Sequence, residues 1–149
     1  MNKAERIEFV ISEFRKADIT IDENQADKFV RLCDFMVEYN ENVNLTSITE
    51  FSEVVVKHFV DSVLPFTMVD IPQGSSFIDV GSGAGFPAIP LLICRPDLKG
   101  TLCDSLNKRC VYLEKACELI GVKSEIIHAR SEELGRKKRE CFDFATARA

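Results

Sequence analysis

The sequence predicts an α/β domain in which an α-helical segment precedes a parallel sheet. The first 70 residues repeat apolar side chains at helical spacing, and the remainder alternates four short apolar runs with helical stretches. A glycine-rich turn follows the first of these runs. Strands that alternate with helices form parallel βαβ units with right-handed crossovers. We therefore divide the chain into a helical segment, residues 1–70, and a sheet-forming segment, residues 71–149.

Three helices are expected in the helical segment. The first carries an apolar stripe at helical spacing, formed by Ile7, Val10, Ile11 and Phe14. Asp22 and Gln25 have the spacing of a capping box, and the stripe of the second helix follows them as Phe29, Leu32, Cys33, Met36 and Val37. Three asparagines within residues 39–44 predict a loop. The third helix is expected from Glu50 to Leu64, with apolar residues at every fourth position and Pro65 as its end.

Four strands and two helices are expected in the sheet-forming segment. The strands are predicted at residues 76–80, 100–104, 124–129 and 142–147. One helix begins near Pro87 and ends before Arg95, because proline is tolerated in a first helical turn. The other runs from Asn107 to Ile120, and Gly121 stops it.

Composition and charge limit the possible classes of protein. The chain has 149 residues, 46% hydrophobic and 29% charged, which is typical of one globular domain. No apolar stretch is long enough to span a membrane, and no signal peptide is visible, so we expect a cytoplasmic protein. The six cysteines form no CxxC pair, which favours reduced, buried thiols over disulfides or a metal site. The net charge of −5 is uneven, because residues 1–70 carry 7 Lys/Arg against 14 Asp/Glu.

The glycine-rich turn is the most informative motif. Asp79-Val80-Gly81-Ser82-Gly83-Ala84-Gly85 reads D-x-G-x-G-x-G, whereas a dinucleotide-binding turn reads G-x-G-x-x-G. A strand that ends in glycines at the start of a helix exposes backbone N–H groups at the carboxyl edge of the sheet, where ligands bind. We therefore predict a cofactor-binding loop. The alternative is a purely structural tight turn, which also needs glycines.

Asp104 supports the cofactor interpretation. It ends the second predicted strand, 23 positions after Gly81, close to the spacing at which an acidic residue accepts hydrogen bonds from ribose hydroxyls. The alternative role is a cap for the helix that begins at Asn107. Position and residue type together favour the ribose role.

Longer strings resemble one family. The matching motifs are Asn44-Leu45-Thr46, His58-Phe59-Val60-Asp61-Ser62, residues 77–91, Asp104-Ser105-Leu106-Asn107-Lys108-Arg109 and Thr146-Ala147-Arg148-Ala149. Together they resemble the RsmG family, also called GidB, of bacterial S-adenosyl-L-methionine-dependent methyltransferases that modify guanine N7 in 16S ribosomal RNA. The resemblance implies a Rossmann-like class I methyltransferase sheet with strand order 3-2-1-4-5-7-6, of which this chain contains the first four strands. It also implies 16S ribosomal RNA or the small ribosomal subunit as partner.

The glycine turn and Asp104 already predict Gly81, Gly83, Gly85 and Asp104 as cofactor-site residues. The resemblance implies that Gly81 and Phe86 frame the methionine and sugar end, that Ser131 and Glu132 contact the adenine, and that Arg148 closes the pocket. Phe86 could instead belong to the core, Glu132 could be a solvated carboxylate, and Arg148 a flexible terminal residue. His58 is interpreted as a half-buried, hydrogen-bonded histidine, and no catalytic residue is named, because guanine N7 carries a lone pair and no proton. Arg95 and Lys108-Arg109 are candidates for phosphate contacts at the cofactor-side rim, and a salt-bridged helix end is the equal alternative.

Two other functions and one association remain open from the sequence. An NAD-binding module would share the glycine turn and Asp104, and a truncated, inactive fragment would retain cofactor binding alone. With strands in the order 3-2-1-4, the fourth strand lies at an edge with unpaired backbone groups. We expect that edge either to pair with a second copy, giving a dimer, or to leave its last residues without order.

Overall fold

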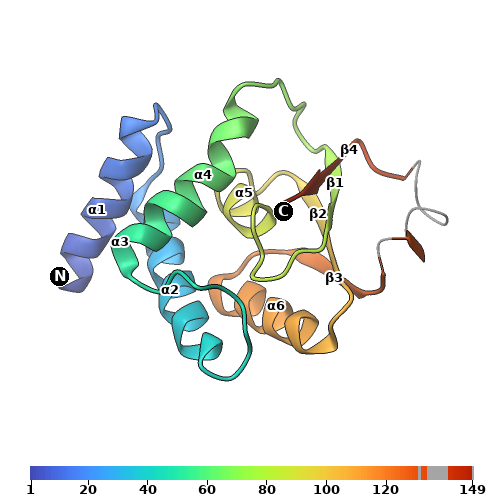
Figure 1. The fold of residues 1–149 in the computed structure, drawn as a ribbon. Coiled ribbons are helices and arrows are strands. Elements are labelled where there is room, and N and C mark those ends of the chain that lie inside the picture. Colours follow the sequence, from blue (N-terminus) through green and yellow to red (C-terminus); the bar gives the residue numbers. More distant parts are fainter. Residues whose placement is uncertain (131, 134–140, 149) are drawn as a thin grey trace.

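Four parallel strands form one sheet in the order β3-β2-β1-β4, as the family resemblance implied (Figure 1). The computed structural model describes residues 1–130, 132–133 and 141–148. The strands are β1 (Ser76–Val80), β2 (Lys99–Asp104), β3 (Ser124–His128) and β4 (Phe144–Ala147). Val80, at the end of β1, pairs with Cys103 on one side and Ala147 on the other. The carboxyl ends of all four strands therefore meet at one edge of the sheet.

Two helices connect the first three strands. They are α5 (Ala88–Cys94) and α6 (Asn107–Ile120). Gly121 ends α6 in the left-handed conformation, with φ of 69°, which confirms its predicted role as a stop. Gly100 allows β2 to approach its neighbours closely, because a Cβ there would lie 2.9 Å from Leu92 Cδ1 and from Phe77 Cζ.

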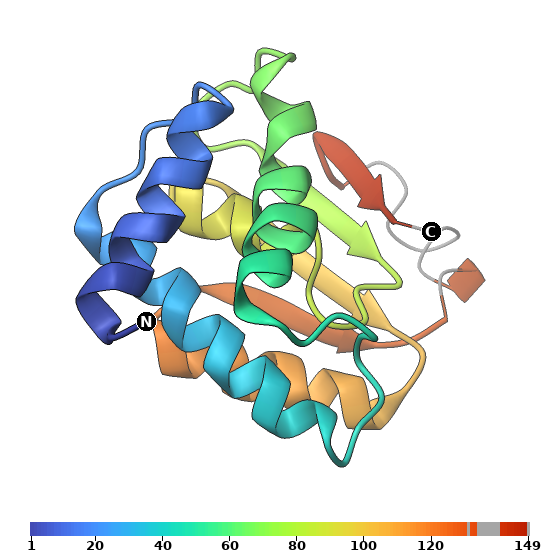
Figure 2. The same ribbon diagram turned by 60° about the vertical axis from the view of Figure 1, so that its left-hand side comes forward.

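The first two helices are α1 (Lys3–Lys16) and α2 (Glu23–Asn40). They lie outside α5 and α6: α2 packs against both of these helices, and α1 packs against α2 (Figure 2). The predicted capping box is confirmed: Gln25 N–H donates to Asp22 Oδ1 at 2.7 Å, and Asp22 N–H donates to Gln25 Oε1 at 2.9 Å. The α2 stripe is buried at Phe29, Leu32, Cys33 and Met36.

The third helical segment differs from the prediction of one regular α-helix. It consists of α3 (Phe51–Val54), the π-helix η1 (Val55–Val60), α4 (Asp61–Val63) and the 3-10 helix η2 (Leu64–Thr67). Apolar residues at every fourth position are spaced more widely than the 3.6 residues of an α-turn, and a wider π-turn keeps Val55, Phe59 and Val63 all buried. Pro65 does not end the segment; it lies in the first turn of η2.

Residues of both segments contribute to one main core. Phe29 and Phe59 from the helical segment pack in the same cluster as Phe77 and Leu102 from the sheet. Successive strand residues face opposite sides, so Ile78 and Cys103 belong to a second, smaller cluster on the other face. Four cysteines are buried, Cys94 is half-buried, and Cys141 is exposed; all six are free thiols. Among the described residues, no helix is both long enough and apolar enough to span a membrane.

Candidate functional site

The glycine turn lies at the carboxyl end of β1, and its glycines have different surroundings. All three have positive φ: 70° at Gly81, 56° at Gly83 and 97° at Gly85. A Cβ on Gly81 would meet no protein atom within 4 Å. A Cβ on Gly85 would clash with the Ile89 side chain and lie 3.2 Å from Leu113 Cδ2. Gly85 therefore serves the packing of α5, while Gly81 faces open space.

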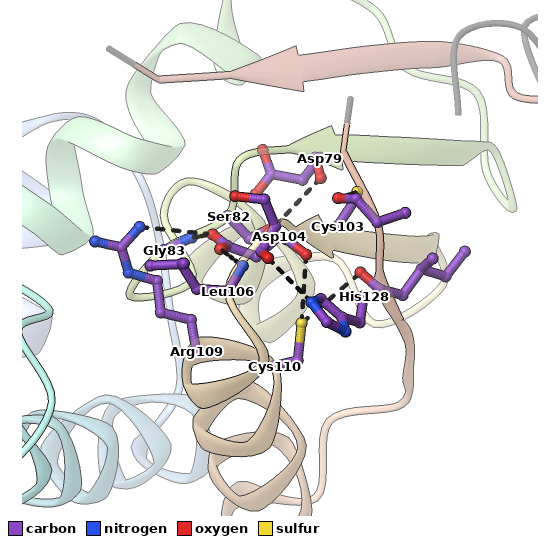
Figure 3. A network of polar contacts seen from close by, with 12 residues as sticks. Asp79, Ser82, Gly83, Cys103, Asp104, Leu106, Arg109, Cys110 and His128 are labelled. Carbon is purple, nitrogen blue, oxygen red and sulfur yellow. Dashed lines mark hydrogen bonds and ion pairs between the residues drawn. The ribbon is translucent and has the colours of Figure 1, made fainter. Parts of the chain in front are cut away.

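Asp104 holds this turn from the next strand (Figure 3). Its carboxylate is only 3% exposed; Oδ2 accepts from Gly83 N–H at 2.8 Å and Oδ1 accepts from Leu106 N–H at 2.9 Å. Arg109 Nη1 lies 4.0 Å from Oδ2. A carboxylate has about four lone-pair sites, so acceptor capacity remains for a ligand. Asp104 thus anchors the glycine turn and the residue before α6, although no side chain caps α6, and its ribose role stays a prediction.

A cleft opens between the glycine turn and the ends of β2 and β3. Its volume is about 270 Å³, and it is lined by Val80, Gly81, Asp104, Ser105, Ala129, Arg130 and Glu132. Three residues of the predicted cofactor site, Gly81, Asp104 and Glu132, therefore share one cleft. Ser131, also predicted there, lies outside the described residues.

Phe86 is part of the core beneath the turn. Its side chain is buried, and its ring stacks on His58, with centroids 4.5 Å apart and planes at 16°. His58 is half-buried and its Nε2 lies 2.8 Å from Thr46 Oγ1, as the hydrogen-bonded interpretation predicted. Burial lowers the His58 pKa to about 4; the Arg148 charge adds to this lowering, and Asp61 opposes it. His58 is therefore neutral near pH 7.

Arg148 is anchored to the π-turn rather than lying free at the end of β4. Its Nη2–H donates to Lys57 O at 2.9 Å and its Nη1–H donates to Ser62 Oγ at 3.3 Å. The π-turn makes the first bond possible, because Asp61 N–H donates to Val56 O and His58 O and leaves Lys57 O without it. Among the described residues, no carboxylate forms an ion pair with Arg148. The helical segment thus fixes a residue of the sheet edge.

The sequence interpretation overlooked the environment of Asp79. The side chain is fully buried, Oδ1 accepts from Thr146 Oγ1–H at 2.7 Å, and Oδ2 has no hydrogen-bond partner among the described residues. Burial raises the Asp79 pKa to about 6; Thr146 and Ser82 oppose the rise, and the Asp104 charge adds to it. The pairing of Asp79 with Thr146 across β1 and β4 depends on the strand register, which the sequence pattern does not reveal.

The predicted phosphate-contacting cations do not lie together. Arg109 is close to Asp104 at the cleft, and Lys108 is exposed beside it at the start of α6. For Arg95 the alternative, a salt-bridged helix end, is the one observed. Its guanidinium pairs with Asp97 and donates to Ile71 O, at the opposite edge, where β1 begins. Within the described ranges, no group of His, Cys, Asp and Glu side chains is arranged to hold a metal ion.

Comparison with known proteins identifies the family. The model of the GidB family, described as rRNA small subunit methyltransferase G, matches residues 25–149. The chain belongs to this family. It is 44% identical over 146 residues to ribosomal RNA small subunit methyltransferase G of Bacillus subtilis strain 168, and 45% identical over 130 residues to that of Clostridium perfringens strain 13. The NAD-binding alternative finds no support among these relatives.

The chain spans about 60% of the length of the Bacillus relative, and a solved structure has a similar fold. The matches cover 96% of this chain but 61% of the Bacillus protein, and 85% of this chain but 54% of the Clostridium protein. A Plasmodium falciparum protein, described as a protein-L-isoaspartate O-methyltransferase and solved with S-adenosyl-L-homocysteine, has a similar fold. Its TM-score is 0.57 at 15% identity, covering 95% of this chain and 72% of that one. The fold is therefore the Rossmann-like class I methyltransferase sheet, with its first four strands present.

Proposed function

We propose that this chain forms the cofactor-binding half of an S-adenosyl-L-methionine-dependent methyltransferase that acts on guanine N7 of 16S ribosomal RNA in the small ribosomal subunit. The observation that carries the proposal is the cleft in which Gly81 faces open space beside the buried carboxylate of Asp104. Membership of the GidB family supports the reaction and the substrate class.

The residues of the cleft fit this cofactor. Gly81 lets the ligand approach the backbone, because no side chain fills the space there. Asp104 retains acceptor capacity for ribose hydroxyls, and Glu132 lines the same cleft. When bound, S-adenosyl-L-methionine supplies an electrophilic methyl group on a sulfonium. The proposed role of Phe86 is indirect, since its buried ring supports the turn from below.

The proposed reaction needs positioning more than proton transfer. Guanine N7 has a lone pair and no proton to lose, so methyl transfer to it requires alignment rather than a general base. His58 is neutral near pH 7 and hydrogen-bonded to Thr46, in agreement with a positioning role. We therefore assign no general acid or base to the described residues.

Substitution of Gly81 tests the cofactor site. Gly81→Ala places a methyl group in the cleft and should weaken S-adenosyl-L-homocysteine binding at least tenfold, on the order of 1.4 kcal/mol, in isothermal titration calorimetry. Gly121→Ala is the matched control, because Gly121 has φ of 69°, has equally open surroundings, and lies at the end of α6. Both variants should lose similar stability, but only the first should lose affinity. Equal affinities in the two variants would show that the cleft is not the cofactor-binding site.

A methylation assay tests the reaction. The chain is incubated with methyl-labelled S-adenosyl-L-methionine and small ribosomal subunits that lack the modification, beside a full-length relative. Label in 16S ribosomal RNA, at guanine N7, supports the proposal. Cofactor binding without transfer, when the relative does transfer, would instead identify this chain as an inactive fragment.

A further inference from the structure

A second cavity lies on the other side of the end of β1 from the cleft. Its volume is about 400 Å³, and it is lined by Asp61, Ser62, Pro65, Phe66, Pro87, Ala145, Thr146, Ala147 and Arg148. Because β1 lies between β2 and β4, the cleft and this cavity flank the same strand end. The Thr146–Asp79 hydrogen bond joins the wall of the cavity to β1. A molecule in the cavity would therefore be a neighbour of a ligand on the glycine turn.

The cavity presents one carboxylate and one guanidinium. Asp61 is exposed and forms no ion pair or side-chain hydrogen bond with any other described residue. Arg148 is fixed by Lys57 O and Ser62 Oγ, and a guanidinium has more N–H donors than these two bonds use. The π-turn sets both groups, because Asp61 ends it and Lys57 O, which it releases, holds Arg148. This arrangement offers a free carboxylate acceptor and an anchored guanidinium donor to one bound molecule.

The remaining walls suit a flat ring with N–H donors on one edge. Pro65, Phe66 and Pro87 provide apolar surface, and aromatic and proline faces pack well against planar groups. An ionised carboxylate accepts hydrogen bonds only. Among the RNA bases, guanine alone places adjacent N–H donors, N1–H and N2–H, on its Watson–Crick edge. Adenine, cytosine and uracil each place a ring nitrogen or carbonyl acceptor beside their donor, and that acceptor would face the carboxylate unfavourably.

We propose that this cavity receives the guanine base of the RNA substrate and that Asp61 is its specificity-determining residue, accepting hydrogen bonds from N1–H and N2–H. The inference rests on the proposed function, whose substrate it places. N7 lies on the opposite edge of the purine from these donors, so recognition by Asp61 leaves the N7 lone pair unengaged. Arg148 then serves the base or its phosphate from the β4 side of the cavity.

Nucleotide titrations of the chain test this assignment. Uniformly ¹⁵N-labelled chain saturated with S-adenosyl-L-homocysteine is titrated with guanosine, inosine and adenosine monophosphates, and amide shifts are followed by NMR. Guanosine monophosphate should shift resonances of residues 61–66 and 145–148, inosine monophosphate should bind more weakly because it lacks the N2 amino group, and adenosine monophosphate weakest. Asp61→Asn should reduce the preference for guanosine over adenosine monophosphate about tenfold. Glu53→Gln, an exposed carboxylate earlier in the same helical segment, should leave it unchanged.

The outcomes separate this inference from the proposed function. Equal binding of guanosine and adenosine monophosphates, or shifts confined to residues outside the cavity, would overturn the base assignment while cofactor binding stands. Failure to bind S-adenosyl-L-homocysteine in calorimetry would overturn the proposed function and the inference with it. If Asp61→Asn does not fold, the comparison of the three nucleotides on the unaltered chain still decides.

Discussion

At the residue scale, the glycines of one motif have different surroundings, packed at Gly85 and open at Gly81. Gly85 is needed because Ile89 and Leu113 occupy the space that a side chain would take. Gly81 has no such neighbour, so packing does not explain its absence of a side chain. The D-x-G-x-G-x-G spacing could not separate these roles, because the distinction depends on which helix residues fold back onto the turn.

Asp104 couples the glycine turn to the cleft. The two oxygens of Asp104 each accept one hydrogen bond, from Gly83 N–H and from Leu106 N–H. Asp104→Asn replaces one of these oxygens with an N–H₂ group, which cannot accept, so one of the two buried donors loses its partner. Loss of a hydrogen bond to a charged group costs about 1–3 kcal/mol, and we expect that loss in urea denaturation together with weaker S-adenosyl-L-homocysteine binding. Asp97→Asn is the control, since Asp97 Oδ2 accepts from Gly74 N–H at 3.0 Å near the opposite sheet edge. If affinity falls equally in both variants, Asp104 has no specific role in the cleft.

At the element scale, local sequence determined the sheet better than the third helical segment. The bounds predicted for β1, residues 76–80, are those observed. This strand is a short apolar run bounded by turn residues, a pattern that is typical of a strand. The strand order that the family resemblance implied is also the one observed. The π-turn could not be predicted in the same way. The Lys57 carbonyl that it releases is satisfied by Arg148, 91 residues away, and no local pattern reveals such a partner.

Removal of Val56 tests the role of the π-turn. Val56 is 40% exposed, and its deletion should convert η1 into a regular α-helix in which the Lys57 carbonyl returns to the helical hydrogen-bond ladder. Arg148 would then lose its 2.9 Å bond, and because Arg148 lines the second cavity, we expect several-fold weaker guanosine monophosphate binding with little loss of unfolding free energy. Val56→Ala, which keeps the chain length, should retain affinity. Unchanged affinity in the deletion variant would show that the π-turn does not position Arg148 for the site.

At the scale of the whole molecule, the helical segment and the sheet both contribute residues to the candidate site. The sheet provides Asp79, the glycine turn and Asp104, and the helical segment provides His58 and Asp61. The division at residue 70 is therefore useful for describing the chain, but the core and the cavity extend across it. Association along the β4 edge stays a prediction, and Arg148 hydrogen-bonded to the helical segment shows how that edge is fixed within one chain.

Buried Asp79 and half-buried His58, one from each segment, give opposite pH dependences of stability. Burial raises the Asp79 pKa to about 6 from 3.8, so between these values the folded chain holds a proton that the unfolded chain has lost. The contribution of Asp79 to the unfolding free energy is therefore lost as pH rises through 6. Burial lowers the His58 pKa to about 4 from 6.5, so its contribution is present above 6.5 and lost as pH falls through 4.

Single substitutions should expose these opposing contributions. Asp79→Asn keeps an acceptor for Thr146 and removes the titration, so its unfolding free energy should rise more steeply than that of the unaltered chain between pH 4 and 6, by up to about 1.4 kcal/mol per pH unit. His58→Gln should have the reverse effect over the same range, smaller because His58 is only half-buried. Urea denaturation at half-unit pH steps measures both differences. Curves for Asp79→Asn that run parallel to those of the unaltered chain would mean that Asp79 titrates in the fold as it does in the unfolded chain, and that the environment at the end of β1 does not hold its proton.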